Sequence, residues 1–212
     1  ASTETFNGTT WTESTSTSSQ PPSMDTALEA FNGGGNASNA ISVGGYTGSA
    51  NVNTTETYAG GTAWAAAAAH PTIVRAHGCD GNSVNALSCG GYTTSNNNGT
   101  YTYLGSGDAW TTQADTMNYS GHAEYGGTAL RGIRVGGYSG SYLATAETWS
   151  YDGSGTDGTW TSIANILEEG RERTSIAGND TNAIWAGGWE DDFTYYTKCN
   201  TWNGSAWATG TV

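Results

Sequence analysis

Three histidines and two acidic clusters are the side chains of this sequence best suited to chemistry. His70, His77 and His122 show neither the His-x-His nor the His-x₃-His spacing of metal-binding pairs. The acidic clusters are residues 168–169 and 190–192, whose oxygens suit Ca²⁺, but they lack the spacing of a calcium loop. The sequence also contains no Gly-x-Ser-x-Gly motif and no phosphate-binding loop. We therefore predict no metal site, no cofactor and no catalytic residues.

The charge balance disfavours two classes of partner. The 212 residues include 19 acidic and 6 basic side chains, which gives a formal net charge of −13. Nucleic acid phosphates require a basic footprint, and anionic membrane surfaces repel the same negative charge. No apolar run approaches the roughly 20 residues that a membrane-spanning helix needs. We predict no nucleic acid partner and no membrane insertion.

Composition favours β-structure. The chain has 32 glycines and is rich in Ser, Thr and Asn, so few helix-forming residues remain. Its 9 tryptophans and 12 tyrosines argue against disorder, because disordered segments are poor in aromatic residues.

A Gly-Gly-aromatic triplet recurs four times and divides the chain into units of 46 to 51 residues. An alternating segment precedes each triplet, and another glycine lies nine residues before it. A short segment ending in an aromatic residue follows, and then a lone tryptophan. The triplets begin at Gly44, Gly90, Gly136 and Gly187, and the earlier glycines are Gly35, Gly81, Gly127 and Gly178. Four strands per unit at this period are typical of a β-propeller blade.

The order of these marks resembles the kelch repeat, and the resemblance covers nearly the whole chain. The basic residue common before the first strand of kelch repeats is present only as Arg75 and Arg173. The resemblance implies that one aromatic residue of the third strand and one tryptophan of the fourth strand are buried between blades. These core residues are Tyr58, Tyr103, Trp149 and Trp202, and Trp64, Trp110, Trp160 and Trp207.

We expect an all-β fold, a single kelch-like propeller domain of four-stranded antiparallel blades over residues 1–212. The complete blades are residues 24–67, 70–113, 117–163 and 167–210. Residues 1–13 match only the last two strands of a unit, so they are expected to form a half-blade. Because the C-terminal unit ends with its fourth strand, either the sequence is a piece of a longer chain or a partner supplies the missing strands. Of these we expect a piece of a propeller with five or more blades.

The three cysteines do not suggest a disulfide framework. Cys89 takes the place of Val43, Val135 and Ala186 in the other repeats, so it is expected to be a small buried hydrophobic residue. Cys79 lies on the preceding strand, where a bridge to Cys89 is conceivable.

Two propeller enzymes remain as alternatives. A kelch-type copper oxidase, of the galactose-oxidase kind, needs a Tyr, His and Cys constellation, and no spacing here singles one out. The stretch Asp157-Gly158-Thr159-Trp160 is similar to the end of the Asp-box of sialidases, but one residue is missing. A turn that enters the fourth strand explains this stretch better.

The repeats are also similar to degenerate kelch-like arrays in structural and appendage proteins of marine phages. The similarity rests on stretches such as Gly44-Gly45-Tyr46, Thr55-Glu56-Thr57-Tyr58 and Gly61-Thr62-Ala63-Trp64. It implies a non-enzymatic structural or binding protein on a virion surface, as a decoration or tail fibre component. Its partners would be other virion proteins or host-surface glycans. The alternatives are a secreted bacterial adhesin or matrix protein, and a glycan-active enzyme or oxidase.

The expected binding face is the end of the propeller where the connections vary among repeats. In an up-and-down blade, the connections between strands two and three and between strands four and one share one end. These connections differ in length and content here, and variable loops on a fixed scaffold are where recognition is expected. The candidate ligand-binding residues are Asn51, Asn97, Tyr142, Asp191 and Tyr195.

Overall fold

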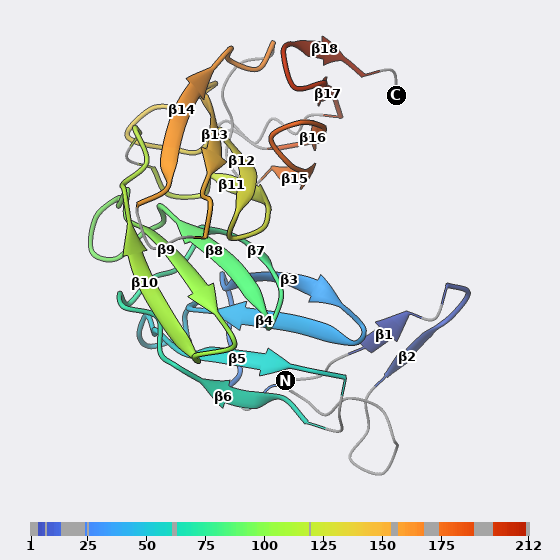
Figure 1. Ribbon diagram of the computed structural model, residues 1–212, viewed down its shortest axis with the longest axis vertical. Helices are drawn as coiled ribbons and strands as arrows, with labels where there is room; N and C mark the ends of the chain where they lie inside the picture. The colour runs from blue at the N-terminus through green and yellow to red at the C-terminus, as the bar shows by residue number, and fades with distance from the viewer. Residues whose placement is uncertain are drawn as a thin grey trace.

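The regular secondary structure of the described residues consists of β-strands. The computed structural model describes residues 4–6, 8–13, 24, 26–60, 63–118, 120–153, 157–167, 174–188 and 197–210. These residues form four four-stranded antiparallel sheets and one two-stranded sheet. The four large sheets are the blades of a β-propeller, and they follow one another along an arc (Figure 1). The all-β propeller predicted from the repeats is confirmed, and no helix in the described part of the chain is fit to cross a membrane.

Each blade contains four strands in sequence order. Blade 1 is β3 (Asn32–Asn36), β4 (Asn39–Val43), β5 (Thr55–Tyr58) and β6 (Ala65–Ala67). Blade 2 is β7 (Gly78–Gly81), β8 (Asn85–Cys89), β9 (Thr100–Leu104) and β10 (Ala109–Gln113). Blade 3 is β11 (Glu124–Gly127), β12 (Arg131–Val135), β13 (Ala146–Ser150) and β14 (Thr159–Ile163). Blade 4 is β15 (Ser175–Gly178), β16 (Ala183–Ala186), β17 (Cys199–Trp202) and β18 (Trp207–Thr209).

The repeat register predicted from the glycine doublets is confirmed. The strand that precedes each doublet is the second strand of its blade, and the four of them, β4, β8, β12 and β16, lie in four different sheets. The N-terminal residues form a separate antiparallel hairpin of β1 (Glu4–Phe6) and β2 (Trp11–Glu13).

A glycine at the end of each first strand explains why the hairpin to the second strand is constant. Gly35, Gly81, Gly127 and Gly178 have φ angles of 123°, 123°, 139° and 117°. A Cβ atom on Gly35 would lie 2.2 Å from the carbonyl oxygen of Asn39 across the hairpin. Only glycine adopts such a backbone at no steric cost.

The first strands lie side by side around the axis, where the blades approach most closely. β7 contacts both β3 and β11, and β11 contacts β15. A Cβ atom on Gly34 would lie 2.2 Å from Oδ1 of Asp80 in the next blade. Asp80 in turn accepts a hydrogen bond of 2.9 Å from the Gly127 amide, which ties blade 2 to blade 3.

The aromatic residues predicted for the core form one ring pair per blade. The two ring centroids are 5.2 to 5.8 Å apart in the four blades. Six of the eight residues are buried: Tyr58, Tyr103, Trp149, Trp160, Trp202 and Trp207. Trp64 and Trp110 are only half-buried, which differs from the expectation.

The cysteines are buried and free. Cys89 is fully buried, as expected from its place in the repeat. Cys79 lies opposite Ser88, and Cys89 lies opposite Gly78. Because side chains alternate along a strand, the two cysteines point to opposite faces of the sheet, so they cannot form the disulfide considered from the sequence.

Candidate functional site

The variable connections meet at one end of the blades, here called the connection face. In blades 1, 2 and 3, isolated backbone bridges join the segment before the first strand to the tyrosine that follows the glycine doublet, as for Glu29 with Tyr46 and Arg75 with Tyr92. The same tyrosines also bridge to the connection that leads to the third strand. The tyrosine therefore holds two connections together at this face.

A cavity of about 520 Å³ opens at the connection face, where the first strands begin. All four blades contribute to this axial cavity. Its lining comprises residues 29–32 of blade 1, Ala76 and His77 of blade 2, His122 and Glu124 of blade 3, and Thr174 of blade 4.

Three residues with left-handed backbone shape the rim of the axial cavity. Ala30, Ala76 and His122 have φ angles of 50°, 50° and 57°. The Ala76 amide donates a hydrogen bond of 2.9 Å to the carbonyl of Ala30, and the His122 amide donates one of 2.7 Å to the carbonyl of Ala76. Left-handed backbone costs roughly 1–2 kcal/mol in a residue other than glycine. These inter-blade hydrogen bonds, here called the axial chain, offset that cost.

Glu124 is the acid at the start of β11. Burial raises the pKa of its carboxyl from 4.5 to about 7, and a hydrogen bond with the Asn32 side chain acts in the opposite direction. Asn32 is fixed in turn, because its Nδ2 donates to the carbonyl of His77 at 2.7 Å. Near neutral pH, Glu124 is therefore divided between a carboxylate that accepts hydrogen bonds and a carboxyl that also donates one.

Two other polar groups of the cavity lining have buried atoms with no hydrogen-bond partner. They are the hydroxyl of Thr174 and both ring nitrogens of His77. A buried polar group left unsatisfied costs about 1–3 kcal/mol. A ligand hydroxyl that reached Thr174 would recover part of this cost.

His77 is kept neutral by its surroundings. Its ring lies 6.1 Å from that of His70, and both rings are buried between blades 1 and 2. Burial is the main cause that lowers the pKa of His70 to about 4 and that of His77 to about 3. The His70 ring also packs edge-on against Trp110, with centroids 4.9 Å apart.

The described residues contain no group of three or more His, Cys, Asp and Glu side chains that could hold a metal ion.

The structure places three of the five predicted ligand-binding residues on the connection face but outside the axial cavity. Asn51 donates to the carbonyl of Thr93 in the next blade at 2.8 Å. Asn97 accepts a hydrogen bond from the Gly99 amide within its own loop. Tyr142 packs against Tyr138, with ring centroids 5.3 Å apart. Asp191 and Tyr195 lie outside the described residues.

Asn96, not Asn97, is the structural equivalent of Asn51. Both residues bridge to the tyrosine of their own doublet. Asn96 also donates to the next blade, to the carbonyl of Tyr138 at 2.9 Å. These two amides therefore connect neighbouring blades.

A second repeated feature holds the connections that lead into the first strands. One polar residue of each third strand binds the connection that enters its own blade, and we call this contact the third-strand latch. The pairs are Glu56 with the Thr26 amide (3.0 Å), Tyr101 with the Thr72 hydroxyl (2.7 Å), Glu147 with Asn118 Nδ2 (2.7 Å) and Asn200 with the Leu167 amide (2.9 Å).

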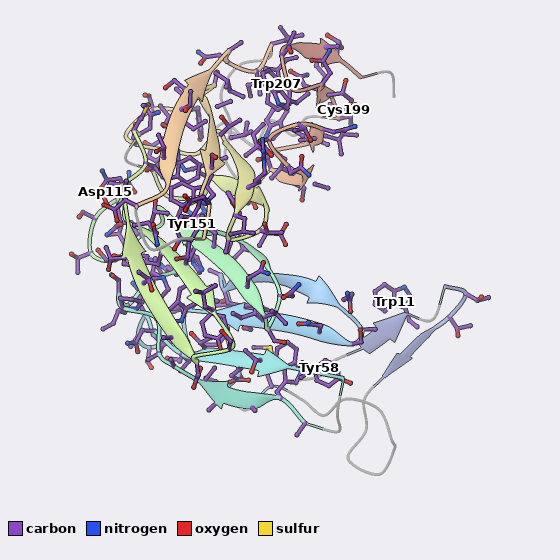
Figure 2. The ribbon with its side chains drawn as sticks, in the orientation of Figure 1. Trp11, Tyr58, Asp115, Tyr151, Cys199 and Trp207 are labelled. Atoms are coloured by element: carbon purple, nitrogen blue, oxygen red, sulfur yellow. The ribbon has the colours of Figure 1, made fainter. Side chains whose placement is uncertain are left out.

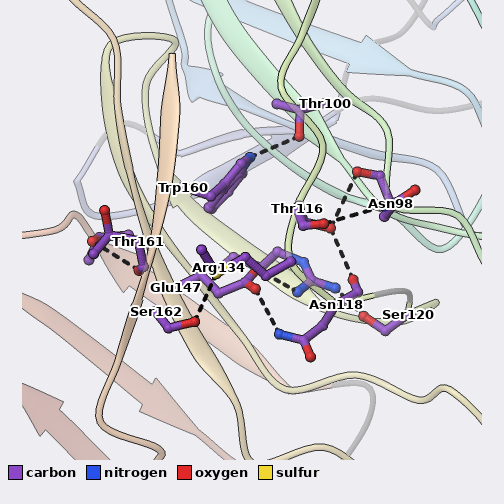
Figure 3. A network of polar contacts seen from close by, with 12 residues as sticks. Asn98, Thr100, Thr116, Asn118, Ser120, Arg134, Glu147, Trp160, Thr161 and Ser162 are labelled. Atoms are coloured by element: carbon purple, nitrogen blue, oxygen red, sulfur yellow. Dashed lines mark hydrogen bonds and ion pairs between the residues drawn. The ribbon is translucent and has the colours of Figure 1, made fainter. Parts of the chain in front are cut away.

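The latch of blade 3 includes a buried ion pair (Figure 3). Arg134 and Glu147 are each 1% exposed, and Arg134 Nη1 lies 3.1 Å from Glu147 Oε2. Arg134 also donates to the hydroxyl of Ser120. The pair thus holds Asn118 and Ser120, which lie shortly before His122 and Glu124 of the axial cavity.

Sequence reasoning missed the axial cavity and its residues Asn32, Glu124 and Thr174, and it considered His122 only as a possible metal ligand. The four blades start their first strands with different residues: Asn32, Gly78, Glu124 and Ser175. That departure from the repeat was the available signal. To predict the cavity from this departure, one must also infer that all four first strands converge on one axis.

The fold and the cavity together define a β-propeller of four-stranded blades with an axial cavity of mixed polar and apolar lining. No protein-family model matches the chain, and no curated protein matches its sequence.

Proposed function

We propose that this chain is a kelch-type β-propeller that acts as a non-enzymatic binding protein. In this proposal the axial cavity takes a neutral, polyhydroxylated ligand such as the sugar residues of a surface glycan. The observation that carries the proposal is the pairing of Glu124 with Asn32 in the wall of a cavity to which every blade contributes.

The residues of the lining suit a sugar. Asn32, Thr174 and a partly protonated Glu124 offer both donors and acceptors to hydroxyl groups. Phe31, which keeps 43% of its surface exposed at the same cavity, offers an apolar ring face. Ligand sites commonly combine an apolar surface with a few fixed polar groups.

We further propose a virion surface as the setting, with other virion proteins or host-surface glycans as partners. This part rests on the similarity of the repeats to phage appendage arrays and on the strongly acidic charge. Mass spectrometry of purified particles is the test, since a virion component must copurify with them in fixed proportion.

The binding proposal is tested on a glycan array with the whole chain. Asn32→Ala and Thr174→Val should each weaken binding at least tenfold, whereas Val84→Ser, at an exposed site on the β7–β8 hairpin, should leave it unchanged. Unchanged binding in both cavity variants, with loss in Tyr142→Ala, would move the site to the variable loops. Release of a sugar from bound glycan that disappears in Glu124→Gln would replace the binding function with a glycan-active enzyme.

A further inference from the structure

Arg75 is held between two tyrosine rings on the connection face. Its Cζ atom lies 5.0 Å from the ring centroid of Tyr46 in blade 1 and 5.3 Å from that of Tyr92 in blade 2. A guanidinium within about 6 Å of an aromatic ring is attracted by the electron density of the ring face. In Figure 2, Asp115, which follows β10, marks the connection face, and Tyr58, at the end of β5, marks the opposite end of the blades.

The guanidinium of Arg75 has no carboxylate partner in the described part of the chain. Arg131 and Arg134 each pair with an acidic side chain, whereas no described side chain forms an ion pair with Arg75 or accepts a hydrogen bond from it. Its nitrogens are not among the buried atoms that lack a partner, so they reach solvent. In a chain with a net charge of −13, this arginine is left available to an anion from outside.

The fold does not require an arginine at this position. Glu29, Arg75 and Gly121 occupy the same place in blades 1, 2 and 3, because each forms the backbone bridge to the tyrosine of its own doublet. The bridge uses main-chain atoms alone, as in the two hydrogen bonds between Arg75 and Tyr92. Since the three side chains differ while the bridge is kept, the scaffold does not explain the guanidinium.

An amide side chain borders Arg75 on the same face. Asn51 bridges to Tyr46, and its Nδ2 donates to the carbonyl of Thr93, the residue after Tyr92, at 2.8 Å. Asn51 therefore spans the two connections whose tyrosines hold Arg75. Its Oδ1 is not among the buried atoms that lack a partner, so this oxygen can accept a hydrogen bond from a ligand hydroxyl.

We propose that Arg75, clamped between Tyr46 and Tyr92, binds the anionic group of an acidic sugar, either a carboxylate or a sulfate. The planar fork of a guanidinium donates two parallel hydrogen bonds to such oxyanions, and charge-assisted bonds of this kind are the strong ones. Asn51 accepts a hydroxyl of the same sugar. That the ligand is a sugar rests on the proposed glycan-binding function, but the site uses no side chain of the axial cavity.

The experiment titrates the whole, isotope-labelled chain with monosaccharides and follows the arginine Nε–H signals by nuclear magnetic resonance. Glucuronate and sulfated galactose are the acidic probes, and glucose and galactose are their neutral counterparts. The acidic probes should shift the signal that is missing in Arg75→Gln, and the better of them should bind at least tenfold more tightly than its neutral counterpart. The comparison of the two acidic probes shows whether the site takes a carboxylate or a sulfate.

Three variants and a control locate the effect. Arg75→Gln should remove the preference for the acidic probe, and Tyr92→Leu, which keeps the charge but loses one ring, should weaken it severalfold. Arg131→Gln is the matched control, because it removes the same charge from an arginine that already pairs with Asp180, and it should leave the preference unchanged. Binding of neutral glycans should survive Arg75→Gln and be lost in Asn32→Ala, so that the two proposed sites fail separately.

The proposal is overturned by a wild-type chain that binds the acidic probes no better than the neutral ones. It is also overturned if Arg75→Gln and Arg131→Gln weaken binding equally, because the overall charge would then explain the preference. Acetate and sulfate ions that bind as tightly as the acidic sugars would reduce the site to a contact with any anion and overturn it as well. Circular dichroism checks that Arg75→Gln is folded, and this variant is decisive even if Tyr92→Leu is not.

Discussion

The interfaces between blades and the lining of the axial cavity are formed by the same four sheets, yet they differ in how strictly they repeat. Between blades, an aliphatic residue meets an aromatic pair three times over, and the tryptophans donate to the preceding blade, as Trp160 does to Thr100 and Trp207 to Ala164. At the axis, the first strands begin with four different residues. The recurring contacts between blades therefore hold the scaffold together. Ligand recognition is expected at the axis, where the residues differ from blade to blade.

The largest effect should come from the repeated interface. Trp160→Ala removes an indole that packs on Trp149 and Leu87 and donates to Thr100 at 2.9 Å, so it should cost about 3–5 kcal/mol of unfolding free energy. Trp110→Ala should cost less, because Trp110 is half-buried. Denaturant titration checks both variants, and a loss below about 1 kcal/mol at Trp160 would show that the repeated interface is not what holds the blades.

A comparable loss is expected from the polar contact that links the scaffold to the cavity. Glu147→Ala leaves the Arg134 charge buried without its partner, which should cost about 3 kcal/mol. Arg131→Ala is the comparison, because the Arg131–Asp180 pair has its arginine 60% exposed and its aspartate 10% exposed, so its loss should cost less than the loss of a pair in which both partners are buried. Equal effects of the two variants in denaturant titration would contradict the role given to burial.

A smaller effect should appear as the pH is lowered. His70 and His77 have folded pKa values of about 4 and 3, below the 6.5 of an exposed histidine. At a pH between the folded and the exposed pKa, the unfolded chain therefore binds more protons than the folded chain. The free energy of unfolding should therefore fall as the pH drops from about 6.5 toward 4. His77→Leu should reduce this slope in denaturant titrations at several pH values. An unchanged slope would mean that the histidines are not the cause.

The smallest effect should come from the axial cavity. Glu124 has a raised pKa of about 7 against 4.5 when exposed, so its contribution favours the folded chain at low pH and is lost as the pH rises from about 4.5 through 7. This sign is opposite to that of the histidines. Glu124→Gln should remain neutral throughout and make unfolding harder at pH 8 than in the wild type. If both proteins unfold at the same denaturant concentration at pH 8, the carboxyl is not held in a protonated form.

The sequence predicts the blades well because glycine and aromatic residues mark features of the backbone. Gly35 and its equivalents have φ angles that other residues avoid. Because every blade has this backbone angle at the same place, glycine recurs there in the sequence. The aromatic pairs recur for the same reason, since every blade must cover its neighbour. Spacing alone therefore gives strand number, register and most of the core.

The sequence predicts the polar contacts poorly. Glu56 and Glu147, each followed by Thr and an aromatic residue, look like solvent-facing charges, but both are buried as third-strand latches. Asn51 was interpreted as a ligand contact because an amide in a variable loop suits a sugar, yet it binds the next blade. A pattern shows which positions recur, whereas a polar side chain's partner depends on segments brought close only by the fold. The axial cavity is such a case, since its residues come from four separate units.

The axial chain has a mechanical consequence. Blades 1, 2 and 3 are joined near the hub by short main-chain hydrogen bonds, as from Ala76 to Ala30, and farther out by side-chain hydrogen bonds, as from Trp110 to Thr55 at 3.2 Å. Two contacts at different distances from the axis resist the tilting of a blade better than a single contact, about which the blade could rotate. A load pulling on the rim would then be shared among adjacent blades and carried to the hub without hinging a single sheet.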